Sequence, residues 1–230
     1  MPAPIVIITP LAIEHAAAVR AMSSHPANRL ARFITCGPGP ANARRAVERS
    51  VAGGSHACIL FGVAGGLSPS DVAPRISRVI DSQGNSWTPS VTHRDRGSET
   101  PGTTVLGIDA PVCTPDAKRR LAASTGASVV DCESHAFAAA AAASGTWWRV
   151  VRGISDPSNE ALPANAARWI DDRGRTRVMA AVLDLIFHPS LWRTTIRLSR
   201  RTSTALHTAG TLLRTVVDEA AEYLGSGDPT

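Results

Sequence analysis

The run Ala57-Cys58-Ile59-Leu60-Phe61, followed at once by Gly62-Val63-Ala64-Gly65-Gly66, decides the fold class of this 230-residue chain. A short, unbroken apolar run that ends in glycines is typical of a strand buried on both faces of a sheet. Two similar runs precede it: Ile5–Ile8, which stops at Thr9-Pro10, and Phe33–Cys36, which stops in alternating glycines and prolines. The chain therefore begins as a series of short strands that a core covers from both sides.

Helical stretches alternate with these strands. We expect helices over residues 12–22, 41–51, 115–124, 134–143, 164–186 (with a break near Gly174) and 191–223. Further strands are expected over residues 76–80, 103–108, 128–130 and 147–154, whereas residues 82–102 are polar and turn-rich and predict a loop. This alternation indicates an α/β fold, with helices packed on both faces of one sheet.

The composition is that of a globular chain, and the charge and motifs limit its possible partners and location. Hydrophobic residues make up 43% and charged residues 19%, and the net charge of +5 suits nucleic acid, anionic lipid or a phosphorylated ligand without choosing among them. No nucleic-acid-binding motif is present, so we expect no nucleic-acid partner. The four cysteines, Cys36, Cys58, Cys113 and Cys132, lack metal-ligand spacing and predict reduced, mostly buried thiols. The N-terminal segment is neither a signal peptide nor a membrane span, so a cytoplasmic location is expected.

Acidic residues follow three of the expected strands, where ligands bind in open α/β sheets. They are Glu14, Glu133 and Asp156. Each has a simpler interpretation: Glu14 as a solvated acid in the first turn of a helix, Glu133 as the cap of an alanine-rich helix, and Asp156 as an N-cap or Asx turn. Their convergence at one edge of the sheet predicts a single pocket.

The order of these segments resembles the nucleoside phosphorylase and methylthioadenosine/S-adenosylhomocysteine nucleosidase superfamily. The matching stretches are Ile7-Ile8-Thr9-Pro10-Leu11-Ala12-Ile13-Glu14, Cys36-Gly37-Pro38-Gly39-Pro40-Ala41-Asn42-Ala43, Phe61-Gly62-Val63-Ala64-Gly65-Gly66-Leu67, Asp131-Cys132-Glu133-Ser134 and Val151-Arg152-Gly153-Ile154-Ser155-Asp156. The last two are the most specific. Within the superfamily, Leu106–Val112, Thr125-Gly126-Ala127 and His188-Pro189-Ser190-Leu191-Trp192 resemble the hopanoid-associated nucleosidase/phosphorylase group.

The resemblance implies a three-layer fold, with a central mixed sheet between helices and an additional C-terminal helix. It also implies cleavage of an N-glycosidic bond, with Asp156 protonating the purine, Glu133 holding the ribose and Glu14 activating water. Cys132, Ala64, Gly65, Val112 and Ser155 would contribute to substrate binding. No metal and no organic cofactor are implied, and inorganic phosphate would enter only as a co-substrate of a phosphorylase.

The nucleophile and the substrate depend on finer features. An acid at Glu14 would repel phosphate, so hydrolysis is favoured over phosphorolysis. By resemblance the substrate is adenosylhopane, and a short loop over residues 82–102 would leave room for a bulky 5′ substituent. Cys132, Val63, Pro111 and Pro74-Arg75 depart from the family pattern. A phosphorylase of a purine nucleoside or methylthioadenosine, and an inactive nucleoside-binding module, remain the alternatives.

The C-terminal segment carries its own pattern. Residues 1–188 are expected to form the catalytic domain, 189–224 a basic helical extension and 225–230 a disordered tail. Arginines and apolar residues alternate at helical intervals over residues 190–205, so this helix either packs on the domain with a solvated arginine face or lies on the inner face of the membrane. Members of the superfamily are generally oligomers, which implies a homodimer here.

Overall fold

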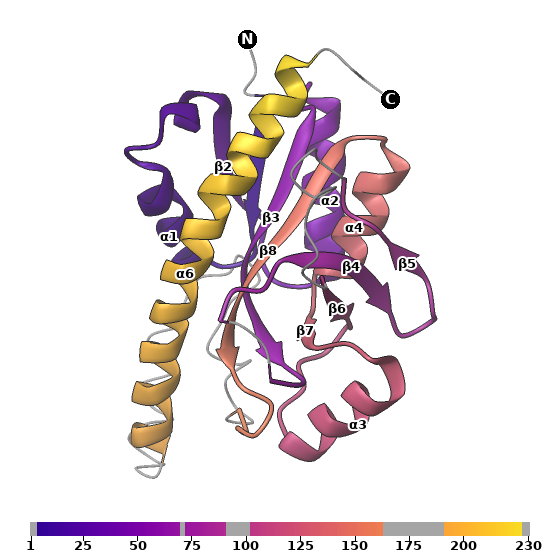
Figure 1. The fold of residues 1–230 in the computed structure, drawn as a ribbon, viewed down its shortest axis with the longest axis vertical. Coiled ribbons are helices and arrows are strands. Elements are labelled where there is room, and N and C mark those ends of the chain that lie inside the picture. Colours follow the sequence, from indigo (N-terminus) through magenta and orange to yellow (C-terminus); the bar gives the residue numbers. More distant parts are fainter. Residues whose placement is uncertain (1–3, 70–71, 91–101, 163–190, 227–230) are drawn as a thin grey trace.

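The computed structural model describes residues 4–69, 72–90, 102–162 and 191–226. Within them, eight strands and six helices follow one another along the chain (Figure 1). The strands are β1 (Ile5–Thr9), β2 (Ala31–Thr35), β3 (Ala57–Gly66), β4 (Ile76–Asp81), β5 (Ser86–Trp87), β6 (Thr103–Gly107), β7 (Val129–Asp131) and β8 (Trp147–Asp156). The α-helices are α1 (Ala12–Met22), α2 (Pro40–Ala52), α3 (Pro115–Thr125), α4 (Ser134–Ala143) and α6 (Leu191–Gly225), and a 3-10 helix covers Pro26–Leu30.

All eight strands belong to one mixed sheet. Its order is β2-β1-β3-β7-β6-β4-β5, and β8 pairs with β3 in parallel. Strand β3 connects the two halves: it runs parallel to β1 through Leu60 and then pairs antiparallel with β7 at Gly65 and Gly66. The predicted α/β class, the mixed sheet and the C-terminal helix are all confirmed.

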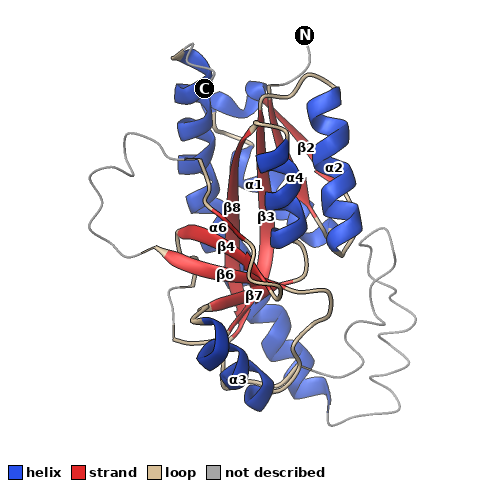
Figure 2. Cartoon of the chain, turned by 90° about the vertical axis from the view of Figure 1, so that its right-hand side faces the viewer, coloured by secondary structure: helices blue, strands red, loops and turns tan. Residues whose placement is uncertain are grey.

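The continuous apolar strands are buried on both faces, as their sequence predicts. Along β1, Val6 and Ile8 pack in one cluster with α2 and α4, whereas Ile5 and Ile7 pack in another with α1 and α6. Strands β3 and β8 divide their side chains in the same alternating way. Figure 2 shows α2 and α4 together beside the sheet, with α6 behind it. The alternation follows from the two-residue period of a strand.

Helix α6 runs alongside β8 in Figure 1 and packs against it. Its inward side buries Leu206, Ala209, Leu213, Val217 and Ala220 in the cluster that it shares with α1. The helix comes so close to β8 that a Cβ on Gly153 would lie 2.4 Å from the carbonyl oxygen of Ala205. The middle and C-terminal part of α6 therefore belongs to the hydrophobic core. None of the helices in the described residues is long and apolar enough to cross a membrane.

Five expectations need correction or fall outside the described residues. Strand β3 extends through Gly66, and β8 through Asp156, so their glycines and acid belong to the strands themselves. Residues 86–87, expected in a loop, form β5 because they pair with β4. Helix α6 includes Gly225, where the disordered tail was expected to begin. The expected helix over residues 164–186 lies outside the described residues.

The cysteines also differ from expectation. All four are free, but only Cys58 is buried, while the others are half-buried.

Candidate active site

Glu14 is buried at the start of α1, directly after β1. Only 1% of its surface is exposed. One carboxylate oxygen, Oε2, accepts a hydrogen bond from the N–H group of Leu11 at 2.7 Å, and Oε1 accepts one from the N–H group of Val63 at 2.8 Å. Glu14 does serve the first turn of its helix, but the simpler interpretation of a solvated acid is wrong, because the side chain is directed into the protein against β3.

Arg152, on β8, is the centre of a buried ionic cluster. Its guanidinium is fully buried and donates from Nε to Oδ2 of Asp131 at 2.6 Å and from Nη2 to Oε2 of Glu133 at 3.1 Å. The other carboxylate oxygen of Glu133 accepts the N–H group of Gly39 at 2.9 Å. Glu133 is thus held between the turn after β2 and strand β8, where it is fixed by two independent partners.

Asp131, rather than Glu133, caps the alanine-rich helix α4. Its Oδ1 accepts the N–H groups of Glu133 at 3.2 Å and Ser134 at 2.9 Å, and the Ser134 hydroxyl donates to Oδ2. Glu133 occupies the N-cap position of α4, as the simpler interpretation expects, but its side chain makes no capping hydrogen bond. Because Asp131 satisfies the helix terminus, Glu133 is free to point toward Arg152.

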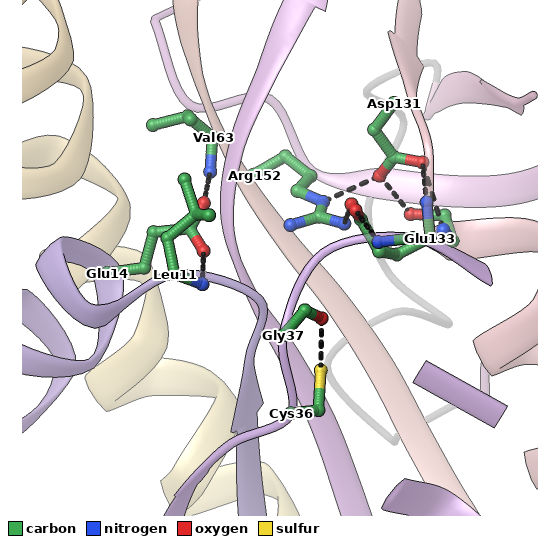
Figure 3. Close-up of polar contacts among 10 residues, drawn as sticks. Leu11, Glu14, Cys36, Gly37, Val63, Asp131, Glu133 and Arg152 are labelled. Atoms are coloured by element: carbon green, nitrogen blue, oxygen red, sulfur yellow. Dashed lines mark hydrogen bonds and ion pairs between the residues drawn. The ribbon is translucent and has the colours of Figure 1, made fainter. Parts of the chain in front are cut away.

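Glu14 and Arg152 face each other beside the backbone of Gly62. A Cβ on Gly62 would lie 2.3 Å from Oε1 of Glu14 and 2.5 Å from Nη1 of Arg152. Nη1 is buried and has no hydrogen-bond partner among the residues that the structure describes. Figure 3 shows Arg152 between Glu14 on one side and Asp131 and Glu133 on the other. A buried N–H donor without a partner costs free energy, so this position suits a small polar molecule that could accept its hydrogen bond.

The carboxylates of Asp131, Glu133 and Glu14 surround the single guanidinium of Arg152. Burial raises the pKa of Glu14 to about 7, although the charge of Arg152 opposes the rise. Burial also raises the pKa of Glu133, again against the effect of Arg152. Glu14 can therefore gain or lose a proton near neutral pH, as a general base must. An excess of acids also favours a ligand that develops positive charge.

Asp156 lies four residues farther along β8, beside Gly65. The hydroxyl of Ser155 donates to its Oδ1 at 2.8 Å, and the ammonium of Lys118 on α3 donates to its Oδ2 at 2.6 Å. Burial raises the pKa of Asp156, and the hydrogen bond and charge of Lys118 act against the rise. A Cβ on Gly65 would lie 3.0 Å from Oδ2 of Asp156, so the lack of a side chain at Gly65 makes room for the carboxylate. These bonds to Lys118 and Ser155 replace the expected alternatives of an N-cap or an Asx turn.

The remaining predicted binding residues lie around these two groups. The Ser155 hydroxyl is 3.3 Å from the carbonyl oxygen of Ala64, next to Gly65 on β3. Cys132 stands between Asp131 and Glu133. Burial raises the pKa of its thiol to about 12, and the negative charges of Glu133 and Asp131 contribute to the rise. Val112 is half-buried and packs against the small cluster beneath α3. The structure thus joins Ala64, Gly65 and Ser155 to Asp156, and Cys132 to Glu133.

The sequence assigned no role to the buried cations Arg152 and Lys118. Each carries a signal that could have identified it. Arg152, like Arg149, interrupts the apolar residues of β8, and a charge in such a strand is buried only when it is paired. Lys118 lies one helical turn before Leu121 and Ala122, on the face of α3 that packs against the domain. The pattern predicts burial of both cations, but not their partners.

The basic stretch of α6 contacts the loop that follows Asp156. Arg197 donates to Glu160 at 3.1 Å, and Arg201 also pairs with Glu160. Arg200 and Ile196 are exposed. The side chains of residues 191–195 lie outside the described residues. Two of the arginines expected at a membrane surface therefore already have an ionic partner within the protein.

Comparisons with known proteins agree with this architecture. Residues 90–186, less than half of the chain, match the family model described as the phosphorylase superfamily. A sequence search of curated proteins finds no match. Among solved structures, 5′-methylthioadenosine/S-adenosylhomocysteine nucleosidase from Helicobacter pylori is 14% identical, with a TM-score of 0.66 over 94% of this chain and 97% of that chain.

Two further structures show the same likeness. Futalosine hydrolase of Helicobacter pylori is 14% identical, with a TM-score of 0.67 over 94% of this chain and 97% of its own. The nucleosidase of S. pneumoniae, solved with a transition-state inhibitor, is 13% identical, with a TM-score of 0.66 over 94% and 99% of the two chains. The chain thus has the fold of these nucleosidases, and its residues 90–186 match the phosphorylase superfamily.

Proposed function

We propose that this protein is an N-ribosyl hydrolase of the phosphorylase superfamily, which cuts the N-glycosidic bond of a 5′-substituted adenosine and releases adenine. The observation that carries the proposal is the pair formed by Glu14 and Arg152. A buried carboxylate with a pKa of about 7 faces an unpartnered guanidinium N–H group across Gly62. A water molecule that accepts from Nη1 of Arg152 could donate to Glu14, and would then be oriented for attack.

The three acids divide the reaction among them. As the C1′–N bond breaks, its electron pair passes to the purine, and Asp156 gives its proton to a ring nitrogen. The ribosyl centre becomes positive, and the nearby carboxylate of Glu133 stabilises it while accepting hydrogen bonds from the ribose hydroxyls. Water adds to C1′ and gives a proton to Glu14. Solvent returns this proton to Asp156, so the enzyme is regenerated.

The charge of the site favours water over phosphate. Asp131, Glu133 and Glu14 together outnumber the one guanidinium that they surround, and an anionic nucleophile would add to the excess of negative charge. Neutral water avoids this cost. It also benefits from a base whose pKa lies near the working pH. The same excess of acids would stabilise a cationic ribosyl centre in either reaction.

The 5′ substituent is the finer part of the proposal. The sequence resembles the hopanoid-associated group most closely, which supports adenosylhopane, a lipid-linked adenosine, as substrate and hopanoid biosynthesis as the setting. The two Helicobacter pylori structures bear the names of a methylthioadenosine/S-adenosylhomocysteine nucleosidase and a futalosine hydrolase. A single fold thus accommodates different substituents, so the substituent must be determined by assay. The homodimer and the membrane contact at residues 190–205 stay predictions.

One assay tests both parts of the proposal. Adenine release is measured over a panel of 5′-substituted adenosines, from methylthioadenosine to long 5′-alkyl derivatives, each with and without phosphate. We expect release without phosphate, and faster release from the alkyl derivatives. Strict dependence on phosphate would establish the phosphorylase instead. No release from any substrate, together with tight binding of adenosine analogues, would establish a nucleoside-binding module.

A further inference from the structure

Lys118 is a buried lysine outside the motifs that carry the proposed reaction. No part of it is exposed, although lysine is among the residues most rarely buried. It comes from α3, whereas its partners all come from the end of β8 and the loop that follows. A fully buried ammonium costs free energy unless nearby oxygen atoms accept its hydrogen bonds, so the oxygen atoms around Lys118 indicate its role.

The ammonium is held by a ring of oxygen atoms. It donates to Oδ2 of Asp156 at 2.6 Å, to the carbonyl oxygen of Pro157 at 2.9 Å and to that of Glu160 at 3.1 Å, and it lies 3.5 Å from the carbonyl oxygen of Asp156. Two firm bonds go to backbone carbonyls, which do not titrate. These two bonds hold the ammonium in place independently of the Asp156 carboxylate.

We propose that Lys118 is a positioning residue for the glycosidic cleavage, which fixes the Asp156 carboxyl and stabilises the carboxylate that remains when its proton passes to the purine. This inference rests on the proposed function. At the start of the step Asp156 is neutral, and at its end it is an anion 2.6 Å from a fixed cation. The attraction is stronger in the transition state than in the ground state, and only such an interaction accelerates the chemistry.

The charge of Lys118 also sets the pH range of the acid. Burial raises the pKa of Asp156, and Lys118 limits that rise. Among the described residues, the other charged group acting on Asp156 is Glu160, which raises its pKa and is itself paired with Arg197 and Arg201 of α6. The neighbouring strand contributes Gly65, which carries no charge. Loss of Lys118 would therefore leave a weaker acid that keeps its proton to higher pH.

The test is the pH profile of kcat for Lys118→Met, with adenine release as the readout. We expect the rate on the plateau to fall by about 10²-fold. We also expect the alkaline limb of the profile to move to higher pH by about 1–3 units, because an opposite charge at this distance lowers the pKa of an acid by that amount. Lys118→Arg, which keeps the charge, should hold the limb near its original position. Arg120→Met, on the exposed side of the same helix, should change neither value.

A purely structural lysine would give a different result. It would lower the rate equally at every pH and leave the limb in place, and this outcome would overturn the inference. Asp156→Asn separates the two proposals: if it stays fully active, the proposed function falls. If Asp156→Asn is inactive while Lys118→Met retains the alkaline limb of the native pH profile, only the proposed role of Lys118 is excluded.

Two further measurements apply if Lys118→Met does not fold. Lys118→Gln retains a donor for the carbonyl groups and removes the charge, so it should move the limb in the same direction. In the unaltered protein, the ¹⁵Nζ shift of Lys118 and the ¹³Cγ shift of Asp156 should follow one titration midpoint. Separate midpoints would show that the two groups are not coupled, and would also overturn the inference.

Discussion

Oε1 of Glu14 and Nη1 of Arg152 both lie on the side of Gly62 where a Cβ would stand, 2.3 Å and 2.5 Å from that position. The two residues are far apart in the sequence, and only the pairing of β1, β3 and β8 brings them together. Each depends on the other: Arg152 limits the rise in the pKa of Glu14, and Glu14 provides negative charge toward the unpartnered side of Arg152.

Replacement of Glu14 by glutamine should remove the base and keep the site. We expect kcat for adenine release to fall by about 10²–10⁴-fold, with little change in the affinity for an adenosine analogue. In the native protein, the rate should rise with pH through about 7, because the base acts only when its carboxyl is ionised. Glu48→Gln, an exposed acid on α2, is the matched control. Full activity of Glu14→Gln would contradict the assignment.

The same carboxyl should make stability depend on pH. Its pKa rises from 4.5 to about 7 on folding, so its stabilising contribution is complete below 4.5 and is lost as the pH rises to about 7. Relative to Glu14→Gln, the native chain should lose on the order of 3 kcal/mol in free energy of unfolding across this range. Urea unfolding of both proteins at pH 4.5, 6 and 8 measures the difference. A constant difference would show that the pKa of Glu14 is unshifted.

Gly62→Ala should damage the site without removing any functional group. The added methyl would lie 2.3 Å from Oε1 of Glu14 and 2.5 Å from Nη1 of Arg152, so these side chains must shift. Overpacking of this kind costs about 1–3 kcal/mol of stability, and displacement of a reacting group by about 1 Å costs about 10²-fold in rate. Adenine release and thermal unfolding report the two effects. Gly225→Ala, whose Cβ would meet nothing within 4 Å, is the control and should retain full activity.

Vesicle binding tests the proposed membrane contact of α6. Deletion of the helix is unsuitable because residues such as Leu213 and Val217 belong to the core. We instead compare the triple variant Arg197→Gln/Arg200→Gln/Arg201→Gln with a control of equal charge on α2, Arg44→Gln/Arg45→Gln/Arg49→Gln. At about 1 kcal/mol per arginine, the α6 variant should sediment with anionic vesicles about 10²-fold more weakly. Equal losses in both variants would indicate nonspecific attraction, and no binding by the native chain would exclude the contact.

Much of the fold could be predicted from local sequence. The apolar runs of β1 and β3 predict strands covered on both faces, and the two core clusters confirm this. The strand boundaries were less predictable: the strand was expected to end at Phe61, yet Gly62–Gly66 continue β3. Pairing with β8 and β7 overrides this local preference.

The sequence by itself determined the short buried strands and the acids at their ends, because burial and secondary structure follow from local hydrophobic patterns. Only the tertiary structure decided how these charges pair. Arg152 meets Asp131, Glu133 and Glu14, and Lys118 meets Asp156, because the extension and register of β3 and β8 set which side chains become neighbours. A buried charge must find a partner, but the partner's identity depends on distances in space that no local pattern contains.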